Sequence, residues 1–182
     1  MLIYTEMTPN PASLKFVTDR TLVSGGVADF PDAPAAEGRS KFAEKIFKYP
    51  FVNGVFIGRN FVTVTKSADS RWEDLIPVVK DEVKRYAESG EKWVEAEEAL
   101  QPFDEGTELD RRIRTVIEEQ VRPAVAMDGG DIIYEGYDDG VVKLRLRGSC
   151  SGCPSSMVTL KHGIQNLLVR LFPEEVKQVE AV

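Results

Sequence analysis

The sequence predicts an α+β protein of two small domains, each with a mixed or antiparallel sheet and helices. Strand-like segments joined by turn residues occur in both halves, and each half also contains amphipathic helices. Residues 89–106 between the halves are acidic and lack a sustained apolar period except around Trp93–Leu100. We therefore expect a first domain over residues 1–88, a linker over 89–106 and a second domain over 107–182.

The first half should form a sheet with two helices. Its segments rich in β-branched and aromatic residues predict strands at Leu2–Glu6, Leu14–Thr18, Thr21–Ser24, Val52–Ile57 and Phe61–Thr65. A helix over Ser40–Tyr49 should stop before the proline that follows it. A longer helix should begin near Ser70 and Glu73, which are spaced as a capping box, and Pro77 predicts a kink or restart within it.

The second half should contain a helix, a hairpin, a second helix and a last strand. Thr107 and Asp110 have capping-box spacing, and the apolar face behind them predicts a helix that ends at Pro123. Turn chemistry and helical periodicity then predict strands at Asp131–Tyr137 and Val141–Arg147, an amphipathic helix over Met157–Leu171 and a strand at Val176–Val182.

Composition excludes several classes of partner. Of the 182 residues, 42% are apolar and 29% are charged, which is the balance of a globular protein with a buried core. A net charge of −7 disfavours nucleic acid and anionic membranes as partners, because both are bound through clustered Lys and Arg. With neither an export signal nor a membrane span in view, we expect a cytoplasmic protein or, if it is a processed organellar protein, a mitochondrial matrix one.

Both cysteines lie in one short segment, GSCSGCPSS at Gly148–Ser156. Pro154 suits the first position of a helix, so Cys153 is the expected N-cap and Cys150 lies in the loop before it. The unpaired N–H groups and the dipole of a helix start favour thiolate over thiol. Small and glycine residues around the cysteines let the backbone approach a bulky ligand. The segment is therefore suited to metal binding or to thiol exchange.

Two other roles for the cysteines are weighed against metal binding. Free thiols used only for packing seldom occur as CxxC in a glycine-rich loop. A thioredoxin-like redox site also places CxxC between a strand and a helix, but such a fold needs further strands beyond that helix. Too few residues follow Cys153 to supply them, and the strand before the motif belongs to a tight hairpin. Both roles are therefore disfavoured.

The number of ligands then decides what kind of metal site is expected. His162 is the only histidine, and its place in a helix is more typical of an exposed residue than of a ligand. One chain thus supplies two strong ligands, Cys150 and Cys153, whereas iron–sulfur clusters and structural zinc sites usually take four thiolates. Two chains would close a shared site at a subunit interface.

At these residues the sequence resembles the NifU-like (Nfu) iron–sulfur cluster carriers, over nearly the whole chain. The second half resembles their C-terminal domain through MDGGDI at Met127–Ile132, the GSCSGCPSS segment, and TLKHGI at Thr159–Ile164. The first half resembles their N-terminal domain through TPNPASLKF at Thr8–Phe16, ADFPDA at Ala28–Ala33 and GVFIGRNFVTVTK at Gly54–Lys66.

The resemblance implies a function without catalysis. It assigns Cys150 and Cys153 as ligands of a [4Fe–4S] cluster, or alternatively a [2Fe–2S] cluster, bridged between two copies of the chain in a homodimer. The cluster would pass to apo iron–sulfur client proteins, with the cluster-assembly machinery as a further partner. The alternative is a zinc-bridged or thiol-active protein whose first domain binds partners.

Two further features have a structural and a functional interpretation. Asp128–Asp131 form a turn by their chemistry, and the resemblance suggests a loop packed near the cluster. Lys143, Arg145 and Arg147 alternate with apolar residues, so they should form the basic face of a strand. That face is either simply solvated or offsets the charge of the cluster or of an acidic client.

Overall fold

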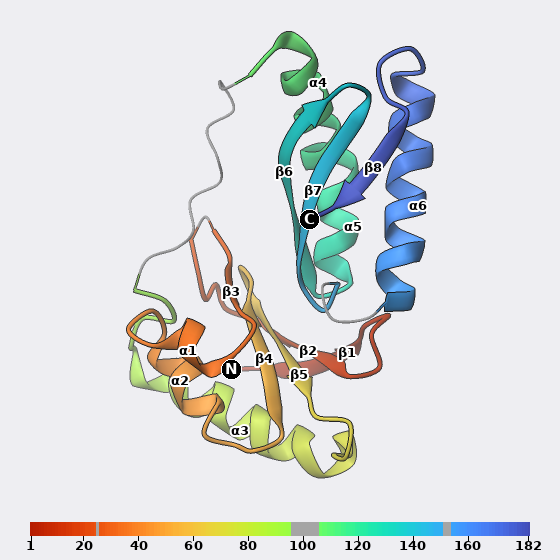
Figure 1. Cartoon of the computed structure of the whole chain (residues 1–182). Helices are drawn as coiled ribbons and strands as arrows, with labels where there is room; N and C mark the ends of the chain where they lie inside the picture. Colours follow the sequence, from red (N-terminus) through yellow and green to blue (C-terminus); the bar gives the residue numbers. More distant parts are fainter. Residues whose placement is uncertain (25, 96–105, 151–153) are drawn as a thin grey trace.

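The computed structural model describes residues 1–24, 26–95, 106–150 and 154–182, the last range without the side chains of residues 154–156. It contains one antiparallel sheet and one mixed sheet, each with its own helices, in the two halves of the chain (Figure 1). The α+β class expected from the sequence is confirmed.

The N-terminal half is a five-stranded antiparallel sheet with helices on one face (Figure 1). Its strand order is β1-β2-β5-β4-β3, with β1 at Ile3–Met7, β2 at Ser13–Thr18, β3 at Ala28–Phe30, β4 at Val52–Ile57 and β5 at Phe61–Lys66. The helices are α1 (Ala33–Ala36), α2 (Lys41–Ile46) and α3 (Trp72–Ser89). Alternate residues of the strands, such as Phe16 and Val64, join the core beneath these helices.

Three expectations for this half are corrected. Within the described residues, Thr21–Ser24 forms no strand, because the N–H groups of Leu22 and Val23 bond to the Arg59 carbonyl in a loop. Ser70 does not cap α3: its hydroxyl bonds to Ser67, and the helix begins at Trp72 with Arg71 as its N-cap. Pro77 neither ends nor restarts α3, which packs Leu75, Val79, Val83 and Tyr86 inward along its whole length.

The N-terminal core extends beyond α3 into the segment expected as a linker. Trp93 is only 7% exposed, and its ring centroid lies 4.7 Å from that of Phe42 and 5.0 Å from that of Tyr86. Val94 is buried in the same core, while residues 96–105 lie outside the described part of the chain. We therefore propose that the first domain runs to about residue 95 rather than to 88.

A buried carboxylate ties α3 to α2. Glu82 accepts a hydrogen bond from the Tyr49 hydroxyl at 2.9 Å and forms ion pairs with Lys45 at 2.7 Å and Arg85 at 3.3 Å. Burial alone would raise the pKa of Glu82, but the hydrogen bonds from Lys45 and Tyr49 outweigh it, and the pKa lies below its usual value.

The C-terminal half packs helices against a three-stranded sheet of order β6-β7-β8. Its strands are β6 (Gly130–Asp138), β7 (Val141–Gly148) and β8 (Gln178–Ala181), and its helical segments are α4 (Glu108–Val116), η1 (Ile117–Val121), α5 (Arg122–Met127) and α6 (Pro154–Leu171). The β6–β7 hairpin is antiparallel, whereas β8 returns along α6 and pairs parallel with β7. The expected hairpin, long helix and last strand are therefore all present.

The helix expected to end at Pro123 continues to Met127. The capping box of Thr107 and Asp110 begins α4 as expected. The chain then passes through a π-helical segment, η1, whose wider turns precede Pro123 at the start of α5. The N–H groups at the start of a helical segment have no partner within it, so a proline at this position, which has no N–H, loses no hydrogen bond.

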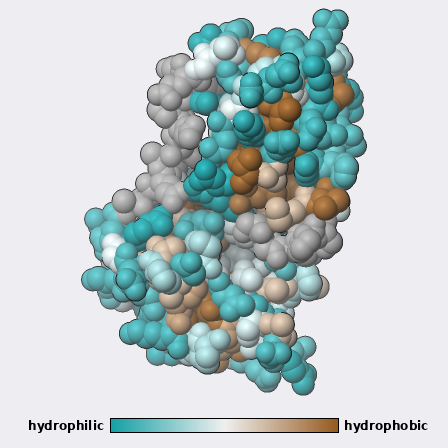
Figure 2. Space-filling model, viewed as in Figure 1, coloured by the Kyte–Doolittle hydropathy of each residue, from teal (hydrophilic) through white to brown (hydrophobic). Residues whose placement is uncertain are grey.

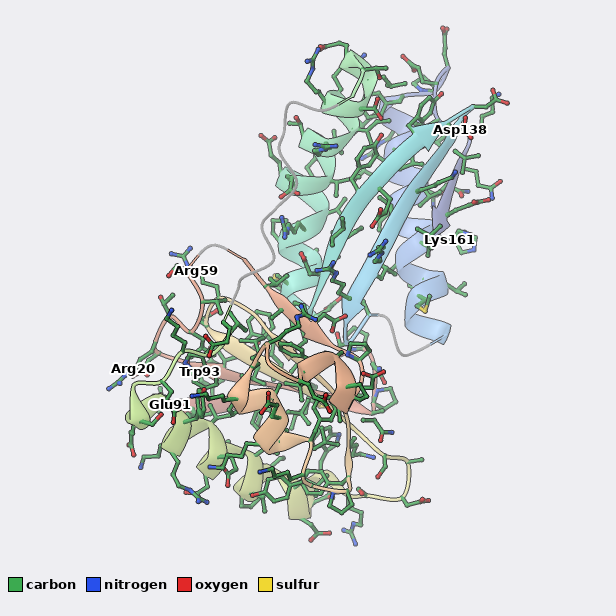
Figure 3. The ribbon with its side chains drawn as sticks, turned by 60° about the vertical axis from the view of Figure 1, so that its left-hand side comes forward. Arg20, Arg59, Glu91, Trp93, Asp138 and Lys161 are labelled. Atoms are coloured by element: carbon green, nitrogen blue, oxygen red, sulfur yellow. The ribbon has the colours of Figure 1, made fainter. Side chains whose placement is uncertain are left out.

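The two domains meet where the β6–β7 hairpin reaches the N-terminal sheet (Figure 1). Asp138 marks the other end of the hairpin, away from the N-terminal domain (Figure 3). Most of the visible surface is hydrophilic, with hydrophobic residues gathered on the C-terminal domain near this junction (Figure 2). No helix among the described residues has the length and apolar character needed to span a membrane.

Candidate metal centre

Cys150 lies just beyond the end of β7, close to the start of α6. Its side chain is only 4% exposed and belongs to the core of the C-terminal domain. Gly130, the first residue of β6, makes room for it: a Cβ on Gly130 would stand 2.9 Å from the Cys150 sulfur and 2.5 Å from the Arg147 carbonyl oxygen. The absence of a side chain at Gly130 therefore lets the thiol lie against the hairpin.

The turn at Asp128–Asp131 is joined to the residue before Cys150. The Ser149 hydroxyl donates to the Asp128 carbonyl, and the Ser149 N–H donates to the Gly129 carbonyl at 3.3 Å. Asp131, which is buried, receives two hydrogen bonds from Arg122, at 2.7 and 3.0 Å. This bidentate interaction fixes both the distance and the orientation of the Arg122 guanidinium and the Asp131 carboxylate. It therefore joins α5 to the hairpin and holds the turn beside Cys150.

The environment of Cys150 favours the thiol over the thiolate. Burial raises its pKa to about 11, and the nearby negative charges of Asp128 and Asp131 add to the rise, against a lowering by the Ser149 hydroxyl. The sequence had suggested that a helix start would favour the thiolate, and for Cys150 desolvation is the stronger effect. A metal that binds here must displace the thiol proton.

The other predicted site residues fall in three groups. Cys153 and its expected N-cap role lie outside the described residues, although α6 does begin at Pro154 as expected. His162 is exposed on α6. The basic residues of β7 lie on the side opposite its buried apolar residues, and Arg145 pairs with Glu135 at 2.9 Å. Across the described ranges, three or more potential metal ligands nowhere come together.

A cleft of about 520 Å³ opens beside Cys150, and both domains line it. Leu160, Ile164 and Leu167 of α6 form an apolar wall, and Pro9 and Asn10 of the N-terminal domain line it as well. The site therefore includes part of the first domain, although the sequence analysis placed it entirely in the second.

Three N-terminal side chains donate hydrogen bonds to backbone carbonyls beside Cys150. Asn10 donates to Ser149 at 3.2 Å, Thr63 to Gly129 at 2.8 Å and Lys15 to Met127 at 3.3 Å. These residues lie in segments that resemble the N-terminal domain of the family, but the sequence alone predicted no role for them. The available signal was that β2 and β5 place polar residues on the sheet face away from the helices, where Lys15 and Thr63 are nevertheless buried.

The fold and this site define a two-domain protein that presents a cysteine loop at the start of a helix. Residues 3–90 match the family described as scaffold protein Nfu/NifU N terminal, and residues 113–180 match the NifU-like domain. The chain belongs to this Nfu/NifU family, as the resemblance of its motifs implied.

Relatives cover the chain from end to end. The human protein named NFU1 iron–sulfur cluster scaffold homolog, mitochondrial, is 41% identical over 185 residues, covering 100% of this chain and 72% of the human protein. NifU-like protein 4, mitochondrial, of Arabidopsis thaliana is 43% identical over 187 residues, covering 99% of this chain and 65% of the plant protein. A solution structure of a NifU-like protein from Saccharomyces cerevisiae covers 53% of this chain and 87% of its own, at 29% identity and a TM-score of 0.45.

Proposed function

We propose that this protein is an iron–sulfur cluster scaffold and carrier. Two copies hold one [4Fe–4S] cluster through Cys150 and Cys153 of each chain and pass it, as cargo, to apo-proteins. The observation that carries the proposal is the position of Cys150 in a cleft beside a helix start, in a chain whose relatives include a named iron–sulfur cluster scaffold. The function requires binding and release, and no catalysis.

The supply of ligands supports a shared site. Within the part of the chain that the structure describes, Cys150 belongs to no group of three or more potential metal ligands. Cys153 adds one thiolate, so a cluster that takes four is completed by a second copy. Because each chain contributes only half of the ligands, client thiols can replace them one chain at a time.

Anaerobic reconstitution with iron and sulfide tests the proposal. The expected product shows broad visible absorption and about two iron atoms per chain, which is the ratio for one four-iron cluster shared by two chains. Cys150→Ser and Cys153→Ser should each abolish binding. His162→Ala, a change of an exposed residue on the same helix, should retain it and serves as the control.

A zinc-bridged or thiol-active protein is the alternative. This alternative predicts that the protein stays colourless and holds zinc through the same cysteines when iron, sulfide and zinc are all supplied. That result would refute the cluster proposal. Sedimentation of apo and reconstituted samples adds a second test, because a monomer with its cluster intact would exclude the shared site. The mitochondrial relatives favour the organellar one of the two expected compartments.

A further inference from the structure

The N-terminal sheet contacts the cysteine loop through the face that its helices leave open. We call this the outer face; Lys15, Val17, Phe56, Phe61 and Thr63 lie on it. Val17, Phe56 and Phe61 form a small apolar cluster there, separate from the main core of the domain. The hairpin end that carries Gly129 and Gly148 rests on this face.

The polar contacts across this junction come from buried side chains of the N-terminal domain. Asn10 is only 3% exposed, and its amide serves both domains: its oxygen accepts from the Ala12 N–H at 3.0 Å while its nitrogen donates to Ser149. Thr63 is 1% exposed and donates to Gly129. Lys15 pairs with Glu6 at 3.0 Å, lies 4.6 Å from the centre of the Phe61 ring and donates to Met127.

The shapes of the two domains also match closely at this junction. A Cβ on Gly129 would meet the Thr63 hydroxyl at 2.8 Å and the Thr8 methyl group at 3.2 Å. A Cβ on Gly148 would meet the Phe56 ring at 2.9 Å. Two glycines thus allow the hairpin end to approach the outer face without a gap, as in a built interface.

We propose that the N-terminal domain is an intramolecular cap on the cysteine loop, and that it must lift before a second chain can complete the cluster site. The inference rests on the proposed function, because the competition requires a site shared between two chains. Asn10 and Thr63 are the positioning residues that hold the cap, since their bonds end on the backbone directly beside Cys150.

The competition follows from the space available at Cys150. A second chain must bring its own loop and helix start to this point. Pro9 and Asn10 of the N-terminal domain form one side of the cleft beside Cys150. A loop and helix start from a second chain that approach Cys150 from this side would have to displace these two residues.

Capping and cluster-linked dimerisation therefore oppose each other. By linkage, whatever weakens the cap must favour the bridged dimer, and the effect counts once for each of the two chains that uncap. In the capped state Cys150 is 4% exposed, and Pro9 and Asn10 narrow the approach to it until the N-terminal domain lifts. Weakening the cap should raise both the reactivity of the thiol and the rate of cluster-dependent dimerisation.

Thr63→Val and Asn10→Asp weaken the cap with little change of shape. Valine matches threonine in size but cannot donate to Gly129. Aspartate keeps the oxygen that accepts from Ala12 and loses the donor to Ser149. Thr65→Val is the matched control, because Thr65 lies two residues along β5 and bonds to Ser13 within the N-terminal domain, at 2.8 Å.

The first measurement follows iodoacetamide labelling of Cys150 in full-length apo chains that carry Cys153→Ser. Each lost cap bond should raise the labelling rate about five- to tenfold, whereas Thr65→Val should label as slowly as its parent. Far-UV circular dichroism verifies that every variant is folded. If one of the two cap variants does not fold, the other still tests the proposal.

The second measurement follows cluster-dependent dimerisation during reconstitution of chains with both cysteines. Thr63→Val and Asn10→Asp should dimerise faster than the wild type and Thr65→Val. If neither labelling nor dimerisation is faster in the cap variants than in Thr65→Val, the cap is overturned. If wild-type protein takes up no cluster at all, the proposed function fails instead, and labelling alone decides whether the cap exists.

Discussion

Gly130→Ala should destabilise the C-terminal domain by about 2 kcal/mol. The new Cβ would stand 2.5 Å from the Arg147 carbonyl oxygen and 2.9 Å from the Cys150 sulfur. Overpacking of this kind costs about 1–3 kcal/mol, and the upper end applies because the carbonyl belongs to the β-ladder and cannot move freely. The lower entropy of an unfolded chain with alanine offsets up to about 1 kcal/mol of that cost.

Urea unfolding followed by two probes separates the domains. The only tryptophans, Trp72 and Trp93, lie in the N-terminal domain, so tryptophan fluorescence reports on that domain alone. Circular dichroism at 222 nm reports on both domains. In Gly130→Ala, the C-terminal part of the dichroism signal should unfold at a urea concentration lower by about 1 M or more, for an m-value of about 1–2 kcal/mol per M.

Gly163→Ala is the matched control within the same domain. Gly163 lies inside α6 with nothing within 4 Å of its missing Cβ, so alanine should stabilise the helix by about 0.5–1 kcal/mol. The steric argument fails if Gly130→Ala unfolds at the wild-type urea concentration, or if Gly163→Ala is the less stable of the two variants.

Two further predictions concern the N-terminal domain. Glu82→Gln should lower its stability by about 1–2 kcal/mol at pH 7, since the partners Lys45 and Arg85 are partly exposed and stay solvated. The pKa of Glu82 lies below its usual 4.5, so its contribution is present above that pH and is lost as the pH falls through the lowered value. When acid unfolding is followed by tryptophan fluorescence, the stability of the variant should therefore depend less steeply on pH than that of the wild type. An equal dependence would contradict the proposed contribution of Glu82. Trp93→Ala should cost about 3–4 kcal/mol in thermal unfolding if the first domain extends to about residue 95; a near-neutral result would return residue 93 to the linker.

Regular periodicity and turn chemistry made most of the fold predictable. The hairpin partners β4 and β5, the β6–β7 hairpin and the helix ending at Leu171 all follow from local patterns of apolar and turn residues. What local patterns could not reveal depends on distant partners. The strand β3 is only three residues long and forms by pairing with β4, and η1 carries the helix past Pro123 through a change in helix type.

The candidate site was predicted in part. The ligand assignment came from the rarity of cysteine, from motif spacing and from the family resemblance, and it stays a prediction. The structure adds the place of Cys150 beside the turn of Gly129 and Gly130. The raised pKa of Cys150 could not be predicted, because desolvation depends on what the folded chain places around the sulfur. The contribution of Asn10 could not be predicted either, since its partner lies 139 residues away in the sequence.

The two adjacent glycines of the turn are restricted by different domains. The three atoms nearest to a Cβ at position 129 belong to the N-terminal domain, whereas the three nearest at position 130 belong to the C-terminal domain. In a homologous C-terminal domain that exists without the N-terminal one, position 129 would be limited only by its positive φ of 80°, which asparagine and aspartate tolerate. Position 130 would remain glycine wherever the cysteine loop is kept. A homologue with a substitution at position 129 but glycine at position 130 is therefore expected to lack the N-terminal domain.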